Sequence, residues 1–204
     1  MQLYYADVLK PRSVCAVARL LESPIEYVYL DLGKGEHLTP DYRKLNPNAK
    51  VPTLVDGERV LWESNAIMCY LADKAGTSLW PRDTARQIDI VRWFGWNAEH
   101  FTACSGALYF EYVIKPRFSL GEADETAVES ALADFRRHAA VLDAHLQGRT
   151  YLVGETLSVA DFAVAVTLPY ADQARLPLEE FPDVQRWHDQ LNALDAWRSP
   201  FPAH

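Results

Sequence analysis

Two residue pairs, Val51-Pro52 and Glu63-Ser64, have the chemistry of a site for an extended, carboxylate-bearing ligand. A backbone edge fixed by a proline presents N–H and C=O groups at constant positions, which is how proteins bind extended peptides. Ser64 precedes a helical stripe of apolar residues and is predicted as its N-cap. The free N–H groups and positive dipole of that helix, with the Ser64 hydroxyl, favour a carboxylate.

A β-hairpin must position the two pairs relative to each other. Residues 53–55 and 59–62 are strand-like, and Asp56-Gly57 between them is a strong two-residue turn signal. Pro52 lies before the first strand, where its missing N–H does little harm, and its bond to Val51 can be cis. Taken singly, each pair is also an ordinary hairpin or cap sequence, and only their ordered combination is specific.

The residues before the hairpin predict a βαβ unit. We expect a strand over 2–5, a helix over 12–22, a strand over 25–32 and a short helix over 40–45. The resulting order, β-α-β-α-β-β-α, is thioredoxin-like, with a right-handed crossover between the parallel strands. We place this domain at residues 1–78.

The chain from residue 84 onward is predicted to be helical, so the fold class is α/β plus all-α, with an all-helical C-terminal domain at residues 84–204. We expect helices over 125–146, 162–168 and 183–192. Ser158 and Asp161 have capping-box spacing before an apolar run, which indicates a structural role.

Aromatic residues follow one predicted helix face at three- and four-residue steps, and such a face belongs either to the core or to a cleft wall. Polar groups on the aromatic rings favour the cleft wall for part of the stripe. The residues with such groups are Trp96, His100, Tyr109 and Tyr112.

Composition excludes several classes of function. The 204 residues carry a net charge of −8 without a block of Lys or Arg, which argues against nucleic-acid binding. No apolar run reaches the roughly 18 residues of a membrane span, and the N-terminus lacks the pattern of a signal peptide. Three dispersed cysteines and six scattered histidines predict no disulfide framework, no metal site and a reducing, cytoplasmic location.

The whole chain resembles the cytosolic glutathione transferases, on the strength of Val51-Pro52, the hairpin, Glu63-Ser64 and the helical second half. The resemblance implies glutathione as co-substrate, a cis Val51-Pro52 bond whose valine backbone pairs with the cysteinyl unit, and a Glu63-Ser64 pair that holds the γ-glutamyl end. His37 and Lys50 also match glutathione contacts, and they would pair with the glycyl carboxylate.

The family further implies a homodimer active in detoxification. The aromatic face described above would then line the pocket for a small hydrophobic electrophile.

The residue that activates the thiol is left open by the sequence. Glutathione's thiol has a pKa near 8.5, as free cysteine does, so attack at neutral pH requires a group that stabilises the thiolate. The N-terminal segment is most similar to the bacterial theta-like transferases, whose catalytic serine matches Leu9, and leucine cannot donate a hydrogen bond. Tyr5, Ser13 and Lys10 are the three substitutes.

Two alternative functions therefore accompany the transferase hypothesis. One is a glutathione-dependent peroxidase, dehalogenase or lyase on the same fold. The other is a transferase-fold binding protein without catalysis, which Leu9 favours.

Overall fold

A four-stranded mixed sheet forms the core of the N-terminal half in the computed structural model, which describes residues 1–203. The strand order is β2-β1-β3-β4, with β1 and β2 parallel and the other neighbours antiparallel. The strands are β1 (Gln2–Tyr5), β2 (Glu26–Tyr29), β3 (Thr53–Asp56) and β4 (Arg59–Trp62). The predicted thioredoxin-like fold is confirmed. Strand β2 is shorter than predicted, because it pairs with a β1 of only four residues.

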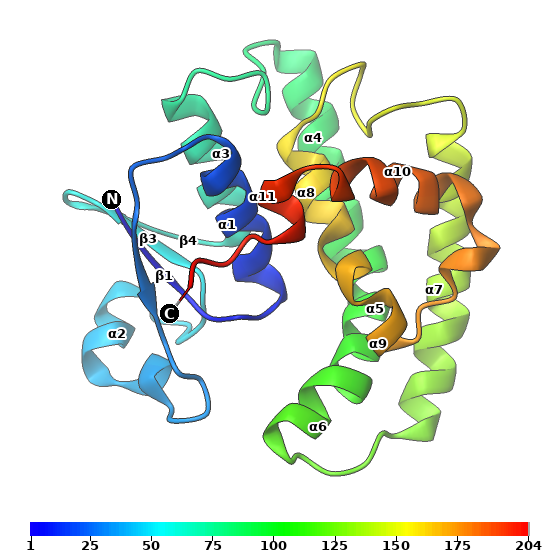
Figure 1. The fold of residues 1–204 in the computed structure, drawn as a ribbon, viewed down its shortest axis with the longest axis horizontal. Coiled ribbons are helices and arrows are strands. Elements are labelled where there is room, and N and C mark those ends of the chain that lie inside the picture. Colours follow the sequence, from blue (N-terminus) through cyan, green and yellow to red (C-terminus); the bar gives the residue numbers. More distant parts are fainter. Residues whose placement is uncertain (204) are drawn as a thin grey trace.

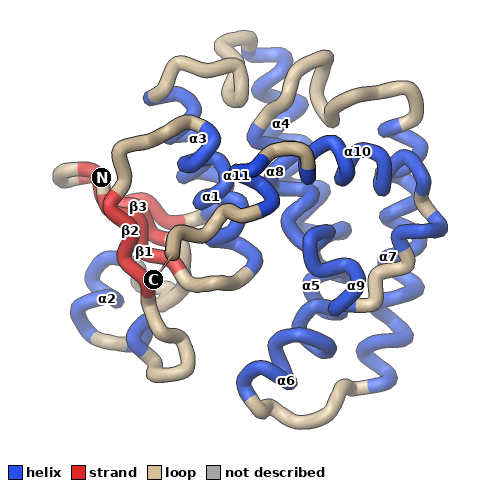
Figure 2. The backbone as a smooth tube through the Cα atoms, in the orientation of Figure 1, coloured by secondary structure: helices blue, strands red, loops and turns tan. Residues whose placement is uncertain are grey.

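Helices cover both faces of this sheet (Figure 1; Figure 2). Helices α1 (Leu9–Leu20) and α3 (Ser64–Lys74) lie on one face, and α2 (Pro40–Leu45) lies on the other. The strand residues that point toward α1 and α3, such as Leu3 and Leu54, are buried.

Helix α1 begins three residues before the predicted start at residue 12. Pro11 is tolerated in its first turn because the first N–H groups of a helix have no partner within it. The helix ends before Glu22, which has a left-handed φ of 48°.

The C-terminal half contains helices and loops and no strand among the described residues. Its first 35 residues form one long rod in which π-helical turns interrupt three α-helical pieces, and a second long helix, α7, runs beside it (Figure 1). The rod consists of α4 (Thr84–Trp96), a π segment (Asn97–Phe101), α5 (Thr102–Tyr109), a π segment (Phe110–Ile114) and α6 (Lys115–Phe118). Next come α7 (Glu125–Leu146), α8 (Val159–Val164), a 3-10 segment (Ala165–Tyr170), α9 (Ala171–Ala174), a 3-10 segment (Leu178–Glu180), α10 (Pro182–Asn192) and α11 (Asp195–Arg198).

The predicted bounds of α7 and the C-terminal end of α10 are confirmed, whereas α8 begins earlier than predicted because it starts directly after its cap, Ser158. His204, the last residue of the second predicted domain, lies outside the described residues. None of the helices within residues 1–203 combines the length and apolar character needed to cross a bilayer.

Helix α1 and the C-terminal segment join the two halves. The Nη2 atom of Arg12 donates to the carbonyl of Trp197 at 2.6 Å, and Arg19 donates to the carbonyl of Ser199. The tail then returns to the sheet, where the ring of Phe201 stacks on that of Tyr5 with a centroid separation of 6.1 Å (Figure 1). These contacts fix the start of α1 relative to the helical half.

The predicted capping box anchors the helical half. The Asp161 carboxylate is wholly buried and accepts hydrogen bonds from the backbone N–H of Ser158 and from its hydroxyl, both at 2.9 Å. It also accepts from the N–H of Leu152 at 2.9 Å and from the indole N–H of Trp187 at 3.0 Å. One side chain thus links the start of α8 to the preceding loop and to α10.

Replacing Asp161 by Ala should lower the free energy of unfolding by about 3 kcal/mol or more, because four buried donors lose their acceptor. Urea denaturation followed by circular dichroism measures the change. The matched control is Asp73→Ala, since Asp73 is exposed on α3 and makes no side-chain hydrogen bond within the described chain. Equal stabilities of the two variants would contradict the anchoring role.

Candidate functional site

The Val51-Pro52 peptide bond is cis, as predicted, and the loop around it is braced by side chains from α2 and its C-terminal end. The hydroxyl of Tyr42 and the amide Nδ2 of Asn46 both donate to the carbonyl of Lys50, each at 2.7 Å. The same two groups contact the Thr53 hydroxyl oxygen at 2.8 and 3.1 Å. Within residues 1–203, no group hydrogen-bonds to the backbone of Val51. The loop therefore holds a rigid backbone edge with its donor and acceptor unused.

Glu63 and Ser64 form the start of α3, but the N-cap is not the predicted residue. The predicted N-cap was Ser64, whereas the N-cap is Glu63, which has a non-helical backbone with φ 73° and ψ 114°. A positive φ is uncommon for a residue other than glycine, and such strain gathers at functional sites. Ser64 is the first helical residue and is buried, and its N–H belongs to the unpaired first turn. A carboxylate would find these groups at the helix start.

His37 and Lys50 come from two loops that follow β2. His37 lies in a short 3-10 segment (Glu36–Leu38), is half-buried, and its Nδ1 atom has no hydrogen-bond partner among residues 1–203. The Lys50 side chain is exposed, and no carboxylate in the described chain lies within ion-pair distance of it. Both therefore offer polar groups that have no partner within the described protein.

The three candidates for thiol activation differ sharply in their surroundings. The Tyr5 ring is buried against Tyr27, Tyr29 and Phe201, and burial raises its pKa to about 12. The buried Ser13 hydroxyl donates to the carbonyl of Lys10 at 3.0 Å, within its own helix.

Lys10 itself lies half-buried in the first turn of α1, beside Leu9. Burial lowers the pKa of its ammonium, and the nearby negative charge of Glu63 opposes that shift. Of the three candidates, Lys10 is therefore the one whose ammonium group interacts with the charge of Glu63, in the Glu63-Ser64 pair.

The cysteines are not placed for nucleophilic chemistry. All three are unpaired, and burial raises the pKa of Cys15 and Cys69 to about 12 and that of Cys104 to about 11. Such thiols stay protonated at neutral pH and are poor nucleophiles. Any activated thiol must therefore come from a ligand.

The predicted electrophile residues are not brought into one pocket. Trp96 and His100 face α7, where the His100 ring stacks on that of His138 at a centroid separation of 4.8 Å. The buried Tyr109 ring packs edge-on against that of Tyr170 at 4.9 Å. Tyr112 lies elsewhere on the rod, beneath the guanidinium of Arg175.

Burial and the neighbouring Tyr170 raise the pKa of Tyr109, and the positive charges of Arg117 and Arg12 partly oppose this rise. Tyr109 packs on Tyr170, and the Arg12 guanidinium of α1 lies over the Tyr170 ring, so one residue separates Tyr109 from α1.

Helix α6 crosses to the N-terminal half, a contact that sequence reasoning missed. The Nη1 atom of Arg117 donates to the carbonyl of Asp7, in the loop before α1, at 2.7 Å. The neighbouring Phe118 lies against Gly33, where an added Cβ would sit 3.8 Å from the ring. These residues are separated by 85 positions or more, and no local pattern signals their contact. The contact with Asp7 lies beside the start of α1.

Comparisons with known proteins match both halves of the chain. A family model described as glutathione S-transferase, N-terminal domain, covers residues 2–73, and one described as glutathione S-transferase, C-terminal domain, covers residues 101–195. Glutathione S-transferase 3 of Zea mays is 32% identical over 98% of this chain and 92% of its own length. Glutathione S-transferase hmp2 of Hypomyces subiculosus is 34% identical over 95% of this chain and 94% of its own length.

A similar solved structure is the theta class glutathione S-transferase of Xanthomonas axonopodis pv. citri with glutathione bound. It superimposes with a TM-score of 0.88 at 29% identity, over 99% of this chain and 97% of that one. The matched models, the full-length relatives and the braced cis-proline loop beside α3 agree, and the chain belongs to the glutathione S-transferase family.

Proposed function

We propose that this glutathione transferase binds glutathione in an extended form along Val51 and the start of α3, and transfers its thiol to a small apolar electrophile. The observation that carries the proposal is the unpaired backbone edge of Val51, held by the brace from Tyr42 and Asn46. A peptide that pairs with this edge satisfies a donor and an acceptor at once. The three unpaired cysteines suit a cytoplasmic location.

The charges around this edge match the two ends of glutathione. The first-turn N–H groups of α3 and the Ser64 hydroxyl donate to the α-carboxylate of the γ-glutamyl unit, and the Glu63 carboxylate accepts hydrogen bonds from its ammonium. His37 and Lys50 supply the donors for the glycyl carboxylate. The cysteinyl unit then lies at Val51, with its sulfur directed toward the N-terminal end of α1.

Lys10 and the N-terminus of α1 stabilise the thiolate in this arrangement. An ammonium group and the positive end of a helix dipole both favour a negative sulfur. Tyr5 is enclosed by aromatic rings and Ser13 already donates to a backbone carbonyl, so neither hydroxyl is as available. The electrophile then approaches from the side of α6 and Tyr109, where the helical half meets the loop before α1.

Replacing Lys10 by Met should raise the pKa of the bound glutathione thiol by about one unit, because the thiolate loses its cationic neighbour. Titration of the ultraviolet thiolate absorbance of the complex measures this pKa. Ser13→Ala and Tyr5→Phe serve as matched variants and should leave it unchanged.

A different ranking of these variants would assign the role to another residue. A wild-type complex that titrates like free glutathione would support a non-catalytic binding protein, the function that Leu9 at the serine position favours.

Replacing Tyr42 by Phe should raise the KM for glutathione about tenfold with little change in kcat, because the Lys50 carbonyl and the Thr53 hydroxyl lose one of their two supports. Steady-state kinetics at varied glutathione concentration test this. Tyr4→Phe is the control, since the Tyr4 ring packs on Tyr42 but its hydroxyl makes no hydrogen bond within residues 1–203. An unchanged KM in the Tyr42 variant would remove the brace from the binding mechanism.

A homodimer is proposed from exposed apolar side chains on both halves. Val60 and Trp62 on β4 are 37% and 42% exposed, and Ile88 and Val91 on α4 are 64% and 57% exposed. Large exposed apolar residues on neighbouring turns are typical of protein interfaces. The N-terminal half of one subunit would pack against α4 of its partner, as the family resemblance implies.

The double substitution Ile88→Glu and Val91→Glu should convert the dimer to monomers, because two carboxylates cannot be buried unpaired at the interface. Light scattering coupled to size-exclusion chromatography gives the mass. Leu120→Glu is the matched control, since Leu120 is 55% exposed on the loop after α6. A monomeric wild-type protein, or a dimeric double variant, would disprove this interface.

A further inference from the structure

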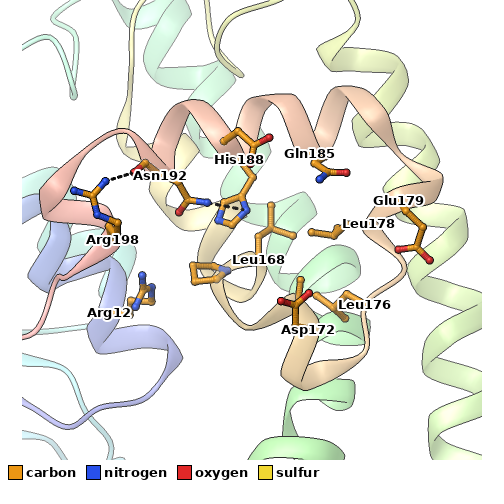
Figure 3. A pocket seen from close by; sticks show the side chains of 13 residues that line it. Arg12, Leu168, Asp172, Leu176, Leu178, Glu179, Gln185, His188, Asn192 and Arg198 are labelled. Atoms are coloured by element: carbon orange, nitrogen blue, oxygen red, sulfur yellow. Dashed lines mark hydrogen bonds between the residues drawn. The ribbon is translucent and has the colours of Figure 1, made fainter.

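A cavity with a volume of about 510 Å³, the α10 cavity, lies in the helical half beneath α10 (Figure 3). Its walls come from the 3-10 segment Ala165–Tyr170, α9, the 3-10 segment Leu178–Glu180, α10 and α11, and α1 contributes Arg12. Its volume is in the range of small-molecule sites. None of the residues proposed to bind glutathione, to activate its thiol or to contact the electrophile lines it. The cavity is therefore separate from the transferase site.

Three leucine side chains and a buried cation contribute to the inner wall of the cavity. Leu168, Leu176 and Leu178 are buried there, and Arg12 is only 7% exposed. The Arg12 guanidinium donates to the carbonyl of Trp197 and lies over the rings of Tyr170 and Trp197. Its Nε atom has no partner, and among residues 1–203 no carboxylate lies within ion-pair distance of it. A buried cation without an opposite charge is costly, so an anionic group at this inner wall would be stabilised.

His188, which also lines the cavity, adds a second unused polar group. It is 7% exposed, hangs from α10 toward Leu168 in Figure 3, and has no hydrogen-bond partner for Nε2 within the described residues. The Asn192 Nδ2 atom lies 3.5 Å from its Nδ1, and when it donates there the neutral ring carries its proton on Nε2. Burial and the charge of Arg12 lower the His188 pKa to about 4, so the ring is neutral at pH 7.

The mouth of the cavity has the opposite charge. Asp172, Glu179 and Asp189 are exposed carboxylates on three different elements, and none of them forms an ion pair in the part of the chain that the structure describes. Arg198, also at the mouth, is already paired with Asp195. A ligand that satisfied this cavity would therefore carry an anion at its inner end and a cation at its outer end.

We propose that this cavity binds a short apolar peptide with free termini, of the size of a dipeptide. Its carboxylate lies against Arg12 and His188, its aliphatic side chains pack on Leu168, Leu176 and Leu178, and its ammonium faces the carboxylates of the mouth. The site goes beyond the proposed transferase function, because it shares no residue with the binding of glutathione.

Isothermal titration of leucyl-leucine into the full chain, with the first site saturated by S-hexylglutathione, tests the proposal. N-acetyl-leucyl-leucine lacks the ammonium and leucyl-leucine amide lacks the carboxylate. Each blocked peptide should bind at least tenfold more weakly than leucyl-leucine. Absence of leucyl-leucine binding, or equal affinity for all three peptides, would overturn the proposal.

Substitutions of the exposed carboxylates at the mouth test the peptide-binding proposal without removing a buried contact. Glu179→Gln with Asp189→Asn should weaken leucyl-leucine about tenfold and leave the acetylated peptide unaffected, because only the ammonium loses its partners. Glu129→Gln, an exposed substitution on α7, is the control and should bind as the wild type does. Arg12→Met should weaken both peptides that carry a carboxylate. If that variant fails to fold through loss of its contact with α11, the mouth variants still decide: wild-type affinity for leucyl-leucine in them would contradict the proposal.

Discussion

The burial of α1 on all sides is the constraint on which the rest of the structure depends. Every residue from 11 to 18 is buried, whereas a surface helix would expose one face. One side of α1 packs on the sheet and α3, and the other packs on α8 and α11 (Figure 1). The two halves therefore cannot shift independently of α1. Its first turn carries Lys10 toward the proposed glutathione site, and Arg12, two residues further on, lines the α10 cavity.

The proposed glutathione site is built from loops whose positions are fixed by polar side chains. Tyr42 and Asn46 hold the Lys50 carbonyl, and they leave the next residue, Val51, with an unused edge. Glu63 adopts a positive φ at the start of α3. Regular strands and helices would satisfy these backbone groups internally, and a ligand could then not use them. The local strain and the unsatisfied groups are therefore the features on which the proposed binding depends.

Positively charged side chains lie at both proposed sites, although the protein as a whole is acidic. The net charge is −8, yet Lys10 and Lys50 flank the proposed glutathione site and Arg12 lines the α10 cavity. At physiological salt the repulsion from distant carboxylates is screened within about 8 Å. Nearby, partly buried cations are screened much less, and they decide where an anionic group binds. Net charge therefore predicts poor nucleic-acid binding without excluding specific anion sites.

The sequence by itself determined the features that depend on neighbouring residues. Asp56-Gly57 predicted the hairpin, Ser158 and Asp161 predicted the capping box, and the apolar period predicted the bounds of α7, because turn, cap and helix preferences act over a few residues. The family motif likewise predicted the cis bond at Val51-Pro52.

Tertiary structure decided what covers each face. The helical period placed Trp96 and His100 together, but only packing showed that this face meets α7. The contacts of Arg117 with Asp7 and of Arg12 with Trp197 join residues 110 and 185 positions apart. Periodicity fixes the direction of a side chain relative to its own helix, whereas its partner depends on how the whole chain packs.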